Sequence, residues 1–185
     1  MTDFLKVFKE KKALLEGHFL LTSGLHSDRY MQCAKVLQYP EIAEEIAKAL
    51  ADKIKTKQID VVVSPAIGGI VIGQELARQL GCRAIFCERE NGVMTLRRGF
   101  EIQKDENCLV VEDVITTGGS TNEVIKVVEG FGGKVAGKAC VVDRSAMADF
   151  STSVLKVDIK TYQPENCPLC KTGLPLVQPG SRGNK

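Results

Sequence analysis

Two adjacent acids, Glu112 and Asp113, stand between an apolar run and a loop of glycine and hydroxyl residues. The run Cys108–Val111 is short and apolar enough for a strand that is buried on both faces, and apolar residues recur at helical spacing after Asn122. The Gly-Gly pair in the loop lets backbone amides turn toward an anion at the start of that helix, and the neighbouring hydroxyls add donors. The acids would repel a bare phosphate, so a sugar diol or a magnesium ion must accompany it. A phosphorylated sugar fits all three parts of the segment.

The alternative for this segment is an ordinary strand-to-helix turn, in which acids favour the helix start and glycines relieve crowding. Two common nucleotide loops do not match, because the segment has neither the Gly-Lys-Ser/Thr end of a Walker loop nor Gly-x-Gly-x-x-Gly.

Two further loops follow apolar runs and could complete a site. The loop from Ser64 contains Gly68 and Gly69, and we interpret it as a pyrophosphate cradle; a tight turn that uses glycine only for close packing is the alternative. The charged stretch 88–103 suits a hairpin or flap that closes over a substrate, although such a stretch is also typical of a solvated loop. A cationic flap would neutralise a departing pyrophosphate while excluding water.

The elements that position these loops alternate between strands and helices, which predicts an α/β fold with a mainly parallel sheet. Ligands in such sheets lie beyond the carboxyl ends of the strands, and the three loops follow residues 64, 87 and 112. A helix that begins at Pro40 should precede the sheet, and before it we expect a helix over 3–15 and short strands within 16–32. The expected strands of the sheet are 59–64, 83–87, 108–112 and 134–143, and the expected helices are 70–80 and 122–131.

Length and charge narrow the class of protein. With 185 residues, 44% apolar and 26% charged, the chain can form one full core and is too short for two comfortable domains. A formal charge of +2 does not indicate a nucleic-acid surface. Because we see neither a secretion signal nor an 18-residue apolar stretch, we expect a soluble cytoplasmic protein without nucleic-acid or membrane partners.

The seven cysteines do not indicate a disulfide framework. The spacing of Cys167-Pro-Leu-Cys170 could supply half of a tetrahedral zinc site, but no second Cys or His pair lies near it in sequence. We therefore favour packing of the tail, with metal binding as the alternative if a dimer brings two such pairs together.

The residues from 108 to 121 resemble the signature that type I phosphoribosyltransferases use for 5-phosphoribosyl 1-pyrophosphate (PRPP). The stretch Phe19–Tyr30 resembles the Phe-x-Leu-x-Ser-Gly-x-x-Ser-x-x-Tyr pattern of the orotate phosphoribosyltransferase family, and the likeness runs from about Glu16 through Ser145. It implies the type I phosphoribosyltransferase fold in a single domain, 1–185. A small hood would form from about 1–38 with the C-terminal tail, and the core would span about 40–160.

The resemblance also implies an activity and a set of site residues. The ribose 5-phosphate group of PRPP would pass to orotate, giving orotidine 5′-phosphate and pyrophosphate in UMP biosynthesis. Magnesium would be held mainly by PRPP, near Asp113, without a predicted set of direct side-chain ligands. A homodimer would form in which each flap reaches the neighbour's site. Arg89 and Asp113 would be catalytic. The residues implied to bind PRPP are Glu112, Asp113, Val114, Ile115, Thr116, Thr117, Gly118, Gly119, Ser120, Arg89, Gly68 and Gly69. Those implied to bind orotate are Thr116, Arg144, Tyr30 and Met31.

The chain departs from the family pattern at three positions. Thr22 and Gly68 stand where many relatives carry a lysine, and Val93 occupies a flap position where a catalytic lysine is usual. Other cations must then supply positive charge, or the activity is reduced.

Two alternative functions are open: a phosphoribosyltransferase for purines or another nucleobase, and a non-catalytic regulator that senses PRPP. The second normally needs an added DNA-binding domain or a basic face, for which neither length nor charge leaves room.

Overall fold

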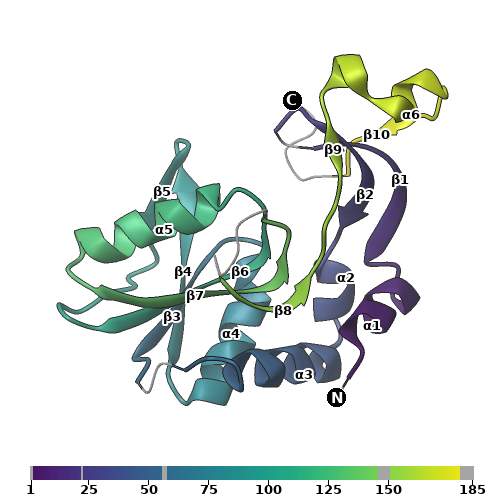
Figure 1. Cartoon of the computed structure of the whole chain (residues 1–185). Helices are drawn as coiled ribbons and strands as arrows, with labels where there is room; N and C mark the ends of the chain where they lie inside the picture. Colours follow the sequence, from purple (N-terminus) through teal and green to yellow (C-terminus); the bar gives the residue numbers. More distant parts are fainter. Residues whose placement is uncertain (1, 22, 56–57, 146–150, 180–185) are drawn as a thin grey trace. The chain divides into compact units, whose positions relative to one another are not determined.

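A computed structural model gives the structure of the chain (Figure 1) and describes residues 2–21, 23–55, 58–145 and 151–179. Thr22, one of the positions that depart from the family pattern, lies outside these ranges. The chain divides into two compact units, residues 1–36 with 158–185 and residues 37–157. The expected single domain, with a hood of about 1–38 and a core of about 40–160, stays a prediction.

The first unit is built around a four-stranded sheet with the order β10-β1-β2-β9. β1 and β2 form an antiparallel hairpin, as expected for 16–32, and the two C-terminal strands pair with its outer edges. The elements of this unit are α1 (Phe4–Glu10), β1 (Leu14–Leu20), β2 (His26–Met31), β9 (Thr161–Tyr162), η1 (Pro164–Asn166), α6 (Pro168–Lys171) and β10 (Leu176–Val177), with α2 (Ala34–Leu37) at its boundary.

The first helix is shorter than the sequence predicts. Asp3 caps it as expected, since its Oδ1 accepts a hydrogen bond from the backbone N–H of Lys6 at 3.1 Å. The expectation that the helix reaches residue 15 is wrong, because Lys12 adopts a left-handed φ of 52° that ends it. Leu14 then begins β1, where it pairs with Met31.

The second unit is an α/β fold whose six-stranded sheet has the order β5-β4-β3-β6-β7-β8. All neighbouring pairs are parallel except β4 and β5, so the predicted mainly parallel sheet is confirmed. Figure 1 shows α5 on one face of the sheet and α3 and α4 on the other. The elements are α3 (Pro40–Ala51), β3 (Val61–Pro65), α4 (Gly69–Leu80), β4 (Arg83–Glu90), β5 (Val93–Leu96), β6 (Asn107–Ile115), α5 (Gly119–Gly130), β7 (Lys134–Asp143) and β8 (Thr152–Lys156).

The central strands are apolar because both faces of the sheet are covered. Every residue of β3 is buried, as the middle strand of a covered parallel sheet should be. Val61 and Val63 point to the face of α5 and pack in one core with Val124 and Val128 of that helix. This packing fixes the carboxyl ends of β3 and β6, which are neighbours in the sheet.

Further differences from expectation lie in the second unit. α5 begins at Gly119, three residues before Asn122, and the strand β8 was not predicted. The expected hairpin in 88–103 is confirmed, since β4 and β5 pair antiparallel around Asn91 and Gly92. None of the helices in the described ranges combines the length and apolar character needed to cross a membrane.

Candidate active site

The acid pair and the two glycine loops lie together at the carboxyl edge of the sheet. β3 leads into the loop of Gly68, and the neighbouring strand β6 carries Glu112 and Asp113 toward the loop of Gly118. A Cβ placed on Gly68 would lie 2.7 Å from each carboxylate oxygen of Asp113. The Gly68 backbone and the Asp113 carboxylate are therefore in direct contact, and the two loops form one site.

The acids are held in a poorly solvated environment. Glu112 is only 9% exposed, and burial, followed by the charge of Asp113, raises its pKa to about 9. Burial also raises the pKa of Asp113, although its Oδ1 accepts a hydrogen bond from the backbone N–H of Val114 at 2.9 Å. A ligand that donates hydrogen bonds or carries positive charge would offset this desolvation. Sugar hydroxyls and magnesium meet that requirement.

The loop after β6 is shaped to bind an anion. Gly118 has a left-handed φ of 77°, which a glycine adopts without strain, and it directly precedes α5. The first amides of a helix have no partner within the helix, so those of α5 are available to a phosphate. Thr116 and Thr117 are exposed, and Ser120 is half-buried. The side chains of this loop can therefore supply hydroxyl donors.

The last two residues of β6 are Val114 and Ile115, and unlike the loop residues they have no polar side chain to offer a ligand. Ile115 is buried in the core and Val114 is half-buried. Their aliphatic side chains offer no polar atom, so any contact with a ligand must come from their backbone.

The loop after β3 uses its glycines in two ways. Gly69 packs against Ser64, where a Cβ would lie 3.0 Å from the serine Cβ, so close packing alone accounts for this glycine. Gly68 is different, because the group that it approaches is the Asp113 carboxylate. The cradle interpretation therefore depends on Gly68 more than on Gly69. The peptide bond between Ala66 and Ile67, in the same loop, is cis.

Arg89 lies on the β4–β5 hairpin and is held within its own chain. Its Nη2 lies 2.7 Å from a carboxylate oxygen of Glu123 on α5, and its Nη1 donates to the carbonyl of Gly92 at 3.0 Å. Val93, at the start of β5, is 66% exposed. A longer polar side chain at position 93 would therefore meet solvent.

The other flap cations are paired with acids of the same hairpin. Nε of Arg98 lies 2.9 Å from Oε1 of Glu88, and Nη2 of Arg97 lies 3.2 Å from Oε1 of Glu90. The Arg98 guanidinium holds the pKa of Glu88 below its usual range. These arginines are largely neutralised in this conformation, so they add little positive field.

The residues expected to bind orotate fall in different units. The backbone N–H of Arg144 donates to the carbonyl of Ile115 at 2.8 Å, which places Arg144 beside the loop of Thr116. Tyr30 and Met31 belong to β2 of the first unit, where Met31 is 5% exposed and the Tyr30 ring lies 5.8 Å from that of Phe19. The structure thus brings together the candidates of the second unit, while the role of Tyr30 and Met31 stays a prediction.

Two residues of a second polar cluster were not predicted from the sequence. His18 and His26 lie against Cys167 and Cys170 in the first unit. The available signal was composition, since these are the only two histidines of the chain and they stand eight residues apart in one predicted hairpin.

Comparison with known proteins gives the class that this fold and site define. Residues 32–165 match the family model described as the phosphoribosyl transferase domain. Relatives in Caldanaerobacter subterraneus subsp. tengcongensis and Caldicellulosiruptor bescii, each named orotate phosphoribosyltransferase, are 56% and 55% identical. The alignments cover 96% and 97% of this chain and 96% of each relative. The chain therefore belongs to the phosphoribosyltransferases, and among them to the orotate phosphoribosyltransferase family.

Solved structures agree with this fold. The orotate phosphoribosyltransferase from Aeropyrum pernix superposes with a TM-score of 0.65 at 24% identity and covers 94% of this chain and 90% of its own. An adenine phosphoribosyltransferase from Thermoanaerobacter pseudethanolicus gives a TM-score of 0.58 at 18% identity, over 70% of this chain and 88% of its own. At these identities the likeness concerns the fold alone.

Proposed function

We propose that the chain catalyses transfer of ribose 5-phosphate from PRPP to orotate, producing orotidine 5′-phosphate and pyrophosphate for pyrimidine biosynthesis. The proposal rests on its membership of the orotate phosphoribosyltransferase family. The single structural observation that supports it best is the contact between Gly68 and the Asp113 carboxylate, because it joins a loop suited to pyrophosphate with a loop suited to sugar phosphate.

The reaction breaks the bond between the anomeric carbon and the pyrophosphate oxygen and forms a bond to a ring nitrogen of orotate. Positive charge develops on the ribose ring, and negative charge develops on the leaving group. In our proposal the loop from Thr116 to Ser120 holds the 5′-phosphate, while Glu112 and Asp113 bind the ribose hydroxyls. The amides of Gly68 and Gly69 and the Arg89 guanidinium receive the pyrophosphate. Catalysis then comes from placement and opposed charges, without a covalent enzyme intermediate.

Orotate requires a different set of contacts. Its ring carboxylate suits a guanidinium fork, and we assign that role to Arg144 because its backbone is bonded to Ile115, directly before Thr116. Tyr30 and Met31 would supply flat and apolar contact to the ring.

Magnesium fits the donor groups present, since two carboxylates whose pKa values are raised by burial lie beside the Gly68 loop. We infer that the ion is held mainly by PRPP oxygens with Asp113 beside it. When bound, magnesium neutralises charge on the pyrophosphate.

We also propose a homodimer in which the hairpin of one copy supplies Arg89 to the site of its partner. The hairpin carries Arg89, and Val93 beside its turn is 66% exposed, so the tip of the hairpin is accessible to a partner. We place the enzyme in the cytoplasm, because its seven cysteines are all free.

The proposal is tested by mixing the protein with orotate, PRPP and magnesium and following the loss of orotate absorbance together with pyrophosphate release. We expect the two to change in equal amounts, and no consumption of PRPP when adenine or uracil replaces orotate. Arg144→Ala should raise the KM for orotate by about tenfold to a hundredfold, from the loss of one charge-assisted hydrogen-bonded pair. Heat from PRPP binding should be unchanged in that variant. A folded protein that consumes no orotate would refute the proposal.

A further inference from the structure

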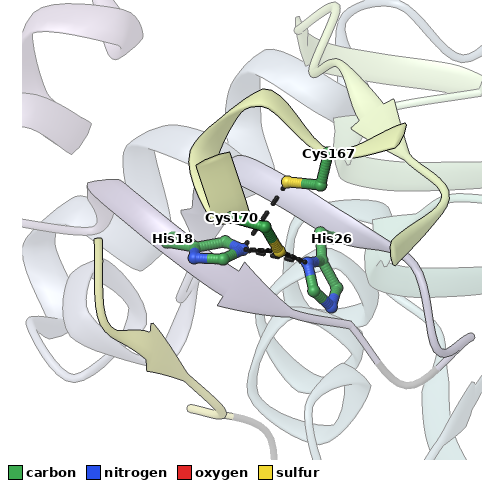
Figure 2. A group of neighbouring side chains, drawn as sticks. All are labelled: His18, His26, Cys167 and Cys170. Carbon is green, nitrogen blue, oxygen red and sulfur yellow. Dashed lines mark hydrogen bonds between the residues drawn. The ribbon is translucent and has the colours of Figure 1, made fainter. Parts of the chain in front are cut away.

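Four side chains of the first unit converge on one point that the proposed reaction does not use (Figure 2). One ligand atom from each of His18, His26, Cys167 and Cys170 lies within 4.8 Å of all the others. His18 comes from β1 and His26 from β2, while Cys167 directly precedes α6 and Cys170 lies within it. Three separate stretches of the chain therefore present two imidazoles and two thiols to the same small volume.

The separations match the edges of a metal tetrahedron. Bonds of about 2.3 Å to sulfur and about 2.0–2.1 Å to nitrogen give sulfur–nitrogen edges of about 3.5 Å. Nε2 of His18 lies 3.6 Å from the Cys167 sulfur and 3.7 Å from the Cys170 sulfur, and Nδ1 of His26 lies 3.3 Å from the Cys170 sulfur. The two imidazole nitrogens are 2.9 Å apart, about half an ångström closer than a tetrahedral edge. Small rotations of the two rings would admit an ion.

The surroundings of His18 prepare its ring as a ligand. Its Nδ1 lies 2.8 Å from the carbonyl oxygen of Leu174, which can only accept a hydrogen bond. Nδ1 must therefore carry the proton, and Nε2 directs its lone pair at the cluster. A backbone carbonyl that fixes the tautomer of a histidine in this way is the usual support of a metal-bound imidazole.

The C-terminal segment also has little else to hold it in place. β9 and β10 are only two residues long, and α6 is four residues long with no buried residue. Leu174, Leu176 and Val177 are exposed, whereas Cys167 is fully buried. Small structures with as little apolar packing as this segment are commonly stabilised by a bound metal.

We propose that His18, His26, Cys167 and Cys170 form a tetrahedral Cys₂His₂ site for Zn²⁺ that ties the C-terminal segment to the β1–β2 hairpin. Thiolate and imidazole ligands favour zinc over magnesium or calcium. The site is structural, because the protein supplies all four ligands and leaves no open position for a substrate. This proposal departs from the sequence-based preference for simple tail packing, because the histidine pair that complements Cys167 and Cys170 comes from the same chain.

The first test is the metal content of the full chain, purified from zinc-supplemented medium and measured by elemental analysis. We expect about one zinc per chain, and at least about a tenfold lower content in Cys170→Ser after the same dialysis. Cys170 is exposed, so this variant should still fold. Cys82→Ser is the matched control, because Cys82 is half-buried and outside the cluster, and it should retain its zinc.

The second test uses the wild-type chain and does not depend on a variant. Removing zinc with a chelator and adding cobalt should give the visible bands of tetrahedral cobalt with a thiolate charge-transfer band, and zinc should displace them. The stripped protein should melt at a lower temperature and recover on adding zinc. A wild-type chain with reduced thiols that holds no zinc and gives no cobalt spectrum would overturn the proposal, as would a Cys167–Cys170 disulfide in the native protein. Neither readout requires turnover, so this outcome is separate from that of the orotate assay.

Discussion

Gly68→Ala tests the contact on which the proposed site depends. The new methyl carbon would lie 2.7 Å from both oxygens of Asp113 and 2.8 Å from its carboxyl carbon, well inside van der Waals contact. The clash cannot be relieved at a flexible chain end, because Asp113 is short and its Oδ1 is bonded to the backbone of Val114 at 2.9 Å. We expect the carboxylate to rotate away and to lose its alignment with the ribose.

The size of the effect follows from that displacement. One hydrogen bond to a charged group contributes about 1.5–3 kcal/mol, which corresponds to a fall in kcat/KM for PRPP of about tenfold to 150-fold. Crowding should lower the free energy of unfolding by about 1–3 kcal/mol. Initial rates at varied PRPP and urea unfolding would measure the two effects separately.

Gly130→Ala is the matched control. Its Cβ would meet nothing within 4 Å, and Gly130 lies at the end of α5, where alanine suits the helix. Its turnover should equal that of the wild type, and its stability should be equal or slightly higher. If Gly68→Ala retains wild-type kcat/KM for PRPP while folded, Asp113 does not act from the position seen here.

Four other variants examine the acid pair and the hairpin. Because burial raises the pKa of Glu112 to about 9, the folded state binds an extra proton between pH 4.5 and about 9, so stability falls as pH rises through that window. Glu112→Gln should flatten this fall, by up to about 1.4 kcal/mol per pH unit in urea titrations, and an unchanged slope would contradict the shift. Arg89→Ala should lower kcat while changing stability by less than about 1 kcal/mol, whereas Glu123→Gln, which removes the partner of Arg89, should keep activity. Val93→Lys should maintain or raise turnover, since position 93 is exposed; a large loss would show that the residue has been assigned the wrong place in the flap.

The sheet and the acid pair could be predicted because each is determined by residues that lie close together in the sequence. The apolar run ending at Val111, the acids and the glycines that follow occupy one continuous segment, and the predicted span of β7, 134–143, agrees with the structure. Covered parallel strands are apolar throughout, so their signal does not depend on distant partners. The contact of Gly68 with Asp113 was harder to predict, because it depends on β3 and β6 being neighbours in the sheet.

Other features depend on contacts that a linear pattern does not carry. β8 has four half-buried residues and one exposed residue, so it lacks the alternation or apolar run that identifies a strand. The end of α1 is set by the left-handed φ of Lys12, a residue type that usually continues a helix. His18 and Cys167 are 149 residues apart, and only the pairing of the C-terminal strands with the hairpin brings their segments together.

The two sites proposed for this chain share a physical origin. Glu112 is 9% exposed beside Asp113, and His18 and His26 are 3% and 6% exposed beside two cysteines. Burying such groups opposes folding unless a partner compensates for the lost water, and apolar residues at the same positions would pack without that cost. In our proposals a magnesium-bound sugar pyrophosphate compensates for the first group and a zinc ion for the second. In both units a buried polar cluster therefore stands where apolar residues would pack at lower cost, and in our proposals the bound ligand compensates for the lost hydration.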